Sequence, residues 1–288
     1  DVVVKVMLTA DASPDALMRF QREARSLARV DHPGIVKVRE LSEFEGYPYF
    51  VMERVNGEDL MVKFEAAIAD TGTPPELDMV LPAIASTARA LDAAHREQIL
   101  HRDVKPANII LENGTGRAVL VDFGLAKQTD GAGDSESGGL TNTGEIVGTP
   151  AFMAPEQFVP DGDWGRIGPA TDVWGFGATA FHCFTGRPLF RQTTVVEIFQ
   201  AMKSEPVPRL SAIAPELPEW LSELVELRKT VRERRGEPDF DRACRVLEEH
   251  DARPTSRELV ALSEALRRQT AKILAEARLI ERRSTLLL

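Results

Sequence analysis

The sequence predicts an α+β fold in which a small β-rich part comes first and a larger helical part follows. Short runs of β-branched and other apolar residues, typical of strands, occur up to residue 121. Beyond residue 170, apolar residues recur mainly at helical spacing. The chain has 288 residues, of which 43% are hydrophobic and 28% are charged, so it is long enough to bury a substantial core.

Charge and cysteine content restrict the possible partners and the compartment. The formal net charge of −10 argues against a nucleic-acid-binding surface and indicates a solvated acidic one. Cys183 and Cys244 lie far apart in apolar or helical surroundings, so we expect reduced packing residues. No signal peptide is visible, and the apolar run 173–184 is too short to span a bilayer. We therefore expect a cytoplasmic location, either alone or as the cytosolic domain of a protein whose membrane segment lies outside this chain.

The first predicted elements are strands and one helix. Residues 2–8 form a strand in which Lys5 stands among β-branched residues, where a charge can also serve to protect an edge strand. Residues 14–30 show helical spacing. Glu23 has arginines on both sides, so it could simply belong to a solvent-exposed helix face on which it forms ion pairs with them. Two paired strands are then expected at 36–41 and 49–52, on either side of a turn at 45–46.

Turn signals and apolar runs divide the rest of the chain. Asn56-Gly57 predicts a turn, and Asp59 is a candidate helix cap. The Gly/Pro cluster at 71–75 is expected to interrupt regular secondary structure. Further elements are expected as a helix leading to residue 95, a hairpin of strands 109–111 and 118–121, a buried helix from 171, and helices at 193–203, 220–249 and 256–283. Glycine and proline interrupt the 220–249 pattern, so we interpret 228–250 as an insertion.

Two groups of polar residues flank the predicted hairpin. Asp103, Lys105 and Asn108 lie within His101–Asn108, and Asp122 precedes Phe123-Gly124. Phosphoryl transfer from ATP requires a base that orients the attacking hydroxyl, a cation on the moving phosphate and oxygen ligands for Mg²⁺. The hairpin would bring Asn108 and Asp122 close enough to share a metal ion. Either tripeptide alone, His101-Arg102-Asp103 or Asp122-Phe123-Gly124, could occur by chance.

The motifs together, in this order, resemble the eukaryotic-type (Hanks-type) Ser/Thr protein kinases, and most closely their bacterial branch. Ala154-Pro155-Glu156 and an upstream Lys5/Glu23 pair complete the pattern, which extends from Val2 to about Leu262. The resemblance implies a bilobal protein-kinase fold, with a small β-rich N-lobe and a large helical C-lobe. Its parts would be 1–55 (N-lobe), 56–265 (C-lobe) and 266–288 (a helical extension or linker). The N-lobe is incomplete at its start, because the chain begins after the place of the family's Gly-rich loop, and we expect a fragment.

The resemblance also implies a role for each residue of the two groups. Asp103 would orient the substrate hydroxyl, Lys105 would hold the γ-phosphate, and Asn108 and Asp122 would bind Mg²⁺. Thr149, with Lys105, matches the pattern of Ser/Thr-specific members, and its hydroxyl would bridge Asp103 and Lys105. The implied cofactors are therefore ATP and Mg²⁺.

Nucleotide binding by the N-lobe is implied in the same way. Lys5 would reach the α- and β-phosphates, and Glu23 would hold Lys5 in place. Val3 stands where the family has a small Ala, which would narrow the adenine pocket. Asp59 lies where the family often has an acidic residue near the ribose, although a helix cap explains it equally well. The residues implied around the nucleotide are Val3, Met52, Glu53, Val55, Asp59 and Ile110.

A polar stretch at 127–149 lies where the family has its activation loop. Its Gly, Ser and acidic residues cannot form a core, so a plain flexible insert is the simpler interpretation. Thr141 and Thr143 are the best-placed phosphate acceptors, and a phosphate there could bind Arg102. We expect autophosphorylation, for which two kinase molecules would pair.

Three further residues have implied structural roles. Asp172 would stabilise a helix N-terminus, anchor the backbone of the catalytic loop, or do both. A buried Glu156 would pair with Arg253, and loss of either partner would cost about 3–5 kcal/mol.

The function implied is a Ser/Thr protein kinase that transfers the γ-phosphate of ATP to protein substrates. One alternative is a pseudokinase or scaffold with little turnover, because the Gly-rich loop is absent from this chain. A small-molecule kinase of related fold is disfavoured, because Ala154-Pro155-Glu156 and Thr149 shape a groove for a peptide.

Overall fold

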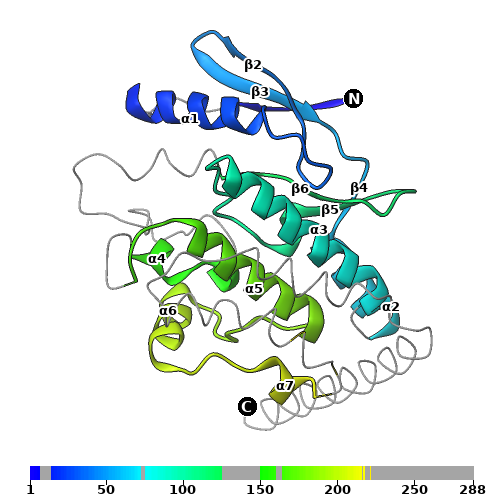
Figure 1. Ribbon diagram of the computed structural model, residues 1–288. Coiled ribbons are helices and arrows are strands. Elements are labelled where there is room, and N and C mark those ends of the chain that lie inside the picture. The colour runs from blue at the N-terminus through cyan, green and yellow to red at the C-terminus, as the bar shows by residue number, and fades with distance from the viewer. Residues whose placement is uncertain are drawn as a thin grey trace, which may run out of the picture.

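A computed structural model of the chain describes residues 1–6, 14–72, 75–124, 150–159, 164–215, 217 and 221, with backbone only for 14–17 and 19. Figure 1 shows a three-stranded sheet with helix α1 beside it, and below them a second small sheet among the remaining helices. The predicted insertion at 228–250, the extension at 266–288 and Cys244 lie outside the described residues. The predicted boundaries of the N-lobe and the C-lobe, at residues 55 and 265, stay predictions.

The first sheet has the antiparallel order β1-β3-β2. Glu45 and Gly46, with φ of 51° and 83°, form the tight turn between β2 and β3, as predicted. Phe20 of α1 contacts Phe50 of β3, with ring centroids 5.9 Å apart, so α1 packs on this sheet. The bounds are β1 Val2–Val6, α1 Pro14–Leu27, β2 Val38–Phe44 and β3 Tyr47–Glu53.

The second sheet has the order β4-β5-β6, with bounds β4 Gly57–Asp59, β5 Ile109–Glu112 and β6 Ala118–Leu120. The predicted hairpin of β5 and β6 is confirmed. The expected turn at Gly57 was wrong, because Gly57 pairs with Glu112, more than fifty residues away. The chain before β2 also joins this sheet: Val36 N donates to Leu120 O (3.1 Å) and Leu120 N donates to Gly34 O (2.8 Å).

Helices and 3₁₀ turns account for most of the rest. Asp59 caps α2 by accepting a hydrogen bond from Val62 N (2.9 Å), and Gly72 and Gly186 end α2 and α5 with left-handed backbones. The helix cap predicted at Asp59 and the break predicted at 71–75 are confirmed. The bounds are α2 Leu60–Thr71, α3 Leu77–Arg96, η1 Pro106–Asn108, η2 Pro150–Phe152, α4 Pro155–Phe158, α5 Pro169–Thr185, α6 Val195–Ser204 and α7 Leu210–Ile213.

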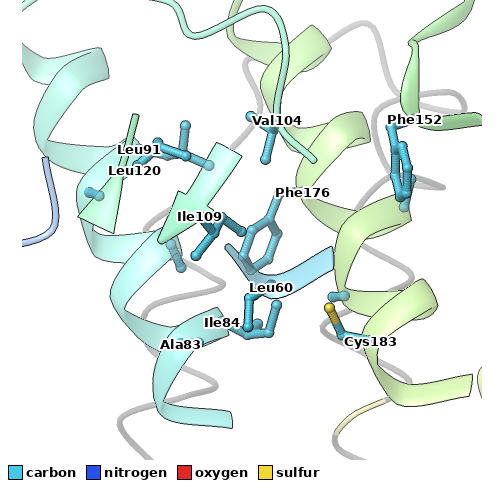
Figure 2. Close-up of a cluster of buried hydrophobic side chains, with 14 of the residues drawn as sticks. Leu60, Ala83, Ile84, Leu91, Val104, Ile109, Leu120, Phe152, Phe176 and Cys183 are labelled. Atoms are coloured by element: carbon cyan, nitrogen blue, oxygen red, sulfur yellow. The ribbon is translucent and has the colours of Figure 1, made fainter. Parts of the chain in front are cut away.

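The core lies where α3 and α5 meet the second sheet (Figure 2). Leu60, Ile84, Ile109 and Phe176 are fully buried there, and α5 is buried on nearly all sides, as its apolar composition predicted. Cys183 of α5 is also buried, and burial raises the pKa of its thiol, which fits a packing residue. In the part of the chain that the structure describes, no helix has both the length and the apolar composition needed to cross a membrane.

Gly57 is the position in β4 that cannot carry a side chain. An added Cβ would collide with the carbonyl oxygen of Leu111 in β5, so the two strands would have to separate. We expect Gly57→Ala to lower the free energy of unfolding by about 1–3 kcal/mol, measured by denaturant unfolding. Gly168→Ala is the matched control, because its Cβ would have its nearest neighbour at 3.8 Å. Equal stability of the two variants would contradict this steric account.

Candidate functional site

Asp103, Lys105 and Asn108 form one cluster in the loop between α3 and β5. Asp103 Oδ2 accepts hydrogen bonds from Lys105 Nζ (2.9 Å) and from Asn108 Nδ2 (3.1 Å). Asn108 Nδ2 also donates to the backbone oxygen of Asp103 (2.7 Å). The 3₁₀ turn η1, which begins at Pro106, carries Asn108 back over Asp103. The loop therefore presents a carboxylate, an ammonium and an amide within hydrogen-bonding distance of one another.

Asp172, in the first turn of α5, holds the backbone of this loop through hydrogen bonds. Its carboxylate is 1% exposed and accepts hydrogen bonds from His101 N (2.8 Å) and Arg102 N (2.6 Å). His95 Nε2 of α3 lies 2.8 Å from the same carboxylate. Asp172 thus combines the two roles considered for it, at a helix N-terminus and on the loop backbone. His95 is the third partner of this carboxylate.

His101 is a buried neutral side chain that holds the loop to the second sheet. Burial lowers its pKa, so the imidazole is uncharged at neutral pH. Its Nε2 lies 2.8 Å from Val121 O, and Asp103 N lies 3.2 Å from its Nδ1. Because a carbonyl only accepts and an N–H only donates, the proton is assigned to Nε2. The ring also contacts Phe123, with centroids 4.6 Å apart.

Several non-glycine residues around the site have left-handed backbones. The φ angles are 59° at Gln98, 62° at Arg102 and 56° at Asp122. Gln98 lies between the end of α3 and the loop that begins at His101. Such conformations persist only where the surrounding structure holds them, and they are concentrated at functional sites.

Lys5 of β1 meets Asp122 of the segment after β6. The distance from Lys5 Nζ to Asp122 Oδ1 is 3.0 Å, and the side chains are 29% and 49% exposed. Asn108 and Asp122 are also neighbours, because Val121 N donates to Asn108 O (2.9 Å). The structure therefore connects the first sheet, the loop with Asp103 and the end of the hairpin at one place.

The predicted ion pair between Lys5 and Glu23 is wrong for this structure. Glu23 Oε1 lies 3.5 Å from Arg102 Nη2, whereas the ammonium of Lys5 pairs with Asp122. The pair does not form because Glu23, on α1, lies beside the loop that carries Arg102. Arg102, assigned from sequence to a phosphate, thus has a carboxylate from α1 beside it.

The residues implied around the nucleotide lie along β1, the end of β3 and β4–β5. Val3 is paired with Met52, which is buried, and Ile110 is paired with Asp59. Asp59 caps α2, so that interpretation of Asp59 is confirmed. Val55 is partly buried against the core. The nucleotide contacts of these residues stay predictions.

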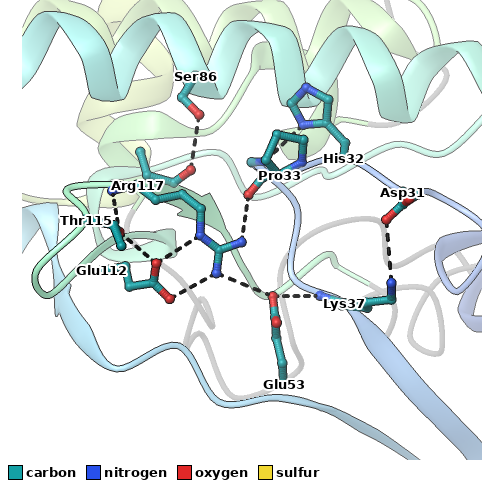
Figure 3. A network of polar contacts seen from close by, with 11 residues as sticks. Asp31, His32, Pro33, Lys37, Glu53, Ser86, Glu112, Thr115 and Arg117 are labelled. Atoms are coloured by element: carbon teal, nitrogen blue, oxygen red, sulfur yellow. Dashed lines mark hydrogen bonds and ion pairs between the residues drawn. The ribbon is translucent and has the colours of Figure 1, made fainter.

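Glu53, at the end of β3, belongs to a polar network around Arg117 (Figure 3). Its Oε1 accepts a hydrogen bond from Lys37 N (3.2 Å) and lies 3.9 Å from Arg117 Nη2. Arg117 also binds Glu112 through two hydrogen bonds of 3.1 Å and donates to Pro33 O (3.1 Å). Sequence reasoning missed Arg117, although opposite charges on the two sides of the 113–114 turn are a signal for a cross-strand pair.

Glu156 and Gln157 extend the site to α4. Glu156 is buried, which raises the pKa of its carboxyl group, and it accepts a hydrogen bond from Thr171 Oγ1 (2.6 Å). Gln157, which sequence reasoning missed, donates through Nε2 to the backbone oxygen of Arg102 (2.8 Å). The proposed residues Thr141, Thr143, Thr149 and Arg253 lie outside the described residues.

The donor set fits a nucleotide-bound Mg²⁺. The amide nitrogen of Asn108 is bound to Asp103, which turns its oxygen away from that carboxylate, and the Asp122 carboxylate is half exposed beside Lys5. Among the described side chains, no group of three or more His, Cys, Asp or Glu could hold a metal by itself. Mg²⁺ typically binds through one or two protein oxygens together with phosphates and water. Asn108, Asp122 and Lys5 are therefore suited to hold a metal–phosphate group.

The sequence profile of the protein kinase domain matches residues 1–259. Serine/threonine-protein kinase PknA of Mycobacterium tuberculosis is 34% identical over 255 residues, which cover 85% of this chain and 55% of PknA. PknF of the same organism is 36% identical over 216 residues, covering 73% of this chain and 43% of PknF. The chain thus spans about half the length of these curated relatives. The crystal structure of the M. tuberculosis PknI kinase domain superposes with a TM-score of 0.58 and 28% identity, covering 86% of this chain and 85% of that one.

Proposed function

Because this chain belongs to the protein kinase domain family and has its bilobal fold, we propose that it transfers the γ-phosphate of ATP to serine and threonine hydroxyls of protein substrates. The observation that carries the proposal is the shared Asp103 oxygen, bound by Lys105 and Asn108 in a loop anchored on Asp172. The Ser/Thr preference follows from the relatives, which are named Ser/Thr protein kinases. Members of this family use ATP and a divalent metal, generally Mg²⁺.

Catalysis would consist mainly of positioning and electrostatic stabilisation. Asp103 would accept a hydrogen bond from the substrate hydroxyl and orient it for attack, and the ammonium of Lys105 would stabilise charge on the transferred phosphoryl group. Asn108 and Asp122 would supply oxygen ligands to Mg²⁺, which neutralises phosphate charge when bound. Lys5 would bind the α- and β-phosphates, and its ion pair with Asp122, a proposed Mg²⁺ ligand, supports this role.

A pseudokinase scaffold is not supported. The named relatives are kinases, and Lys5, Asp103, Asn108 and Asp122 are all present and brought together. A cytosolic location is part of the proposal, because ATP is available there and a buried free thiol at Cys183 suits a reducing compartment. Its partners would be protein substrates and, for autophosphorylation, a second copy.

The direct test is a phosphate-transfer assay with the full-length natural protein. The protein is incubated with labelled ATP, Mg²⁺ and a basic generic protein substrate, and the modified amino acids are identified. We expect phosphoserine and phosphothreonine, and loss of label transfer when EDTA removes the metal. Absence of transfer by correctly folded protein that binds ATP would overturn the proposal and favour a scaffold.

We further propose regulation by autophosphorylation at Thr141 or Thr143. A phosphate carries roughly two negative charges and can replace the Glu23 carboxylate at Arg102, where the present contact of 3.5 Å is long. We expect mass spectrometry of active protein to find phosphate at one of these threonines and Thr141→Ala/Thr143→Ala to lower activity about tenfold or more. Full activity with both threonines unmodified would contradict this regulation.

A further inference from the structure

Gln157 links helix α4 to the loop that carries Asp103. Its Oε1 accepts a hydrogen bond from Ala154 N (2.9 Å), and its Nε2 donates to the backbone oxygen of Arg102 (2.8 Å). The side-chain amide of Gln157 therefore accepts a hydrogen bond from the residue before α4 and donates one to the loop that carries Asp103. Because the amide is planar and rigid, this holds the start of α4 and the peptide after Arg102 in a fixed relation.

The residue that Gln157 contacts has a left-handed backbone. Arg102 has φ of 62°, a conformation that a non-glycine residue keeps only when its surroundings hold it. Its N–H donates to Asp172 Oδ1 (2.6 Å), and its carbonyl accepts from Gln157. Both backbone polar groups of this strained residue are thus held by side chains, one from the first turn of α5 and one from α4.

Helix α4 is itself fixed, so Gln157 is a firm point of attachment. Phe158, the next residue, is buried and stacks on Phe199 of α6 with ring centroids 5.2 Å apart. On the preceding side, Glu156 is buried and bonded to Thr171 of α5. Packing on both sides therefore prevents α4 from following a movement of the Arg102 peptide.

Asp103 directly follows Arg102, so rotation of their shared peptide would move the Asp103 carboxylate relative to Lys105 and Asn108. We propose that Gln157 is a positioning residue for the phosphotransfer reaction: it holds the peptide after Arg102 and thereby aims Asp103. This inference rests on the proposed function, because the consequence of aiming Asp103 is faster transfer. Gln157 itself does not touch the reacting groups.

Gln157→Glu separates the two contacts. A glutamate still accepts the hydrogen bond from Ala154 N, as in a capping box, but it cannot donate to the Arg102 carbonyl. Since small misplacements of a catalytic group have large effects, we expect kcat to fall about tenfold or more. The KM for ATP should change less than about twofold, because Lys5 and Asp122 are held by other elements. Gln200→Glu, the same change on the exposed side of α6, is the control and should leave both constants unchanged.

Hydrogen exchange gives a second measurement that does not require activity. The amides of His101, Arg102 and Asp103 are bonded to Asp172 or His101, so they should exchange faster in Gln157→Glu than in the unmodified protein and in Gln200→Glu. Unchanged exchange there would overturn the inference whether or not the protein is active. An unchanged kcat, or equal damage to kcat, ATP binding and the melting temperature, would also overturn it. If the unmodified protein transfers no phosphate, the proposed function fails, and the exchange result alone decides whether Gln157 holds the loop.

Discussion

Asp103→Asn is expected to reduce phosphate transfer by about 10²–10⁴-fold while the protein stays folded. The carboxylate accepts hydrogen bonds from the Lys105 ammonium and the Asn108 amide at a single oxygen, Oδ2. An asparagine can keep one of these contacts through its own oxygen. It has no charge to orient and polarise a substrate hydroxyl, so the loss should appear in kcat rather than in ATP binding.

Transfer of label from ATP to the basic substrate measures this loss, and ATP affinity and the melting temperature show whether the site and fold survive. Asp92→Asn is the matched control. Asp92 lies on α3, is partly exposed and forms an i,i+4 ion pair with Arg96 (2.8 Å). The same chemical change there should have little effect on transfer. Unchanged turnover in Asp103→Asn would remove Asp103 from the mechanism.

Asp172→Ala is expected to lower the free energy of unfolding by about 3–5 kcal/mol and to abolish transfer in the molecules that remain folded. The carboxylate is buried and holds the backbone N–H groups of His101 and Arg102 as well as His95. Removing it leaves the backbone N–H groups of His101 and Arg102 without this acceptor and releases the strained backbone at Arg102.

Denaturant unfolding measures the stability loss, and hydrogen exchange of the 101–103 amides should report that the loop has been released. Asp92→Ala is the control, and as a partly exposed ion pair its loss should cost under about 1 kcal/mol. Asp172→Asn keeps one acceptor oxygen and should fall between the two. Similar stabilities for Asp172→Ala and Asp92→Ala would show that Asp172 does not anchor the loop.

Local signals in the sequence predicted much of the fold. The β2–β3 and β5–β6 hairpins, the cap at Asp59 and the helix end at Gly72 all follow from turn and cap residues acting on their immediate neighbours. Strand β4 was missed because Gly57 gains its partner from β5, far along the chain. No local pattern contains that pairing.

The residues of the candidate site were identified from polar groups at fixed spacing in the 101–108 loop and at 122–124, and their roles, with those of Lys5 and Glu23, from the resemblance to the kinase family. Their contacts were predicted less well. Lys5 pairs with Asp122 and Glu23 with Arg102, because the position of α1 relative to the loop decides which carboxylate each cation meets. Arg117 and Gln157 were missed, since each acts through backbone or side-chain partners brought near by folding.

The sequence by itself determined the types and order of the chemical groups, because composition and short-range spacing are properties of the chain alone. Only the tertiary structure decided which groups face one another and which side chains hold Arg102, next to Asp103, in its left-handed conformation. The physical reason is that hydrogen bonds and ion pairs act over a few ångströms. Their partners, such as Asp172 and Gln157 for the single residue Arg102, come from segments that only packing brings within that distance.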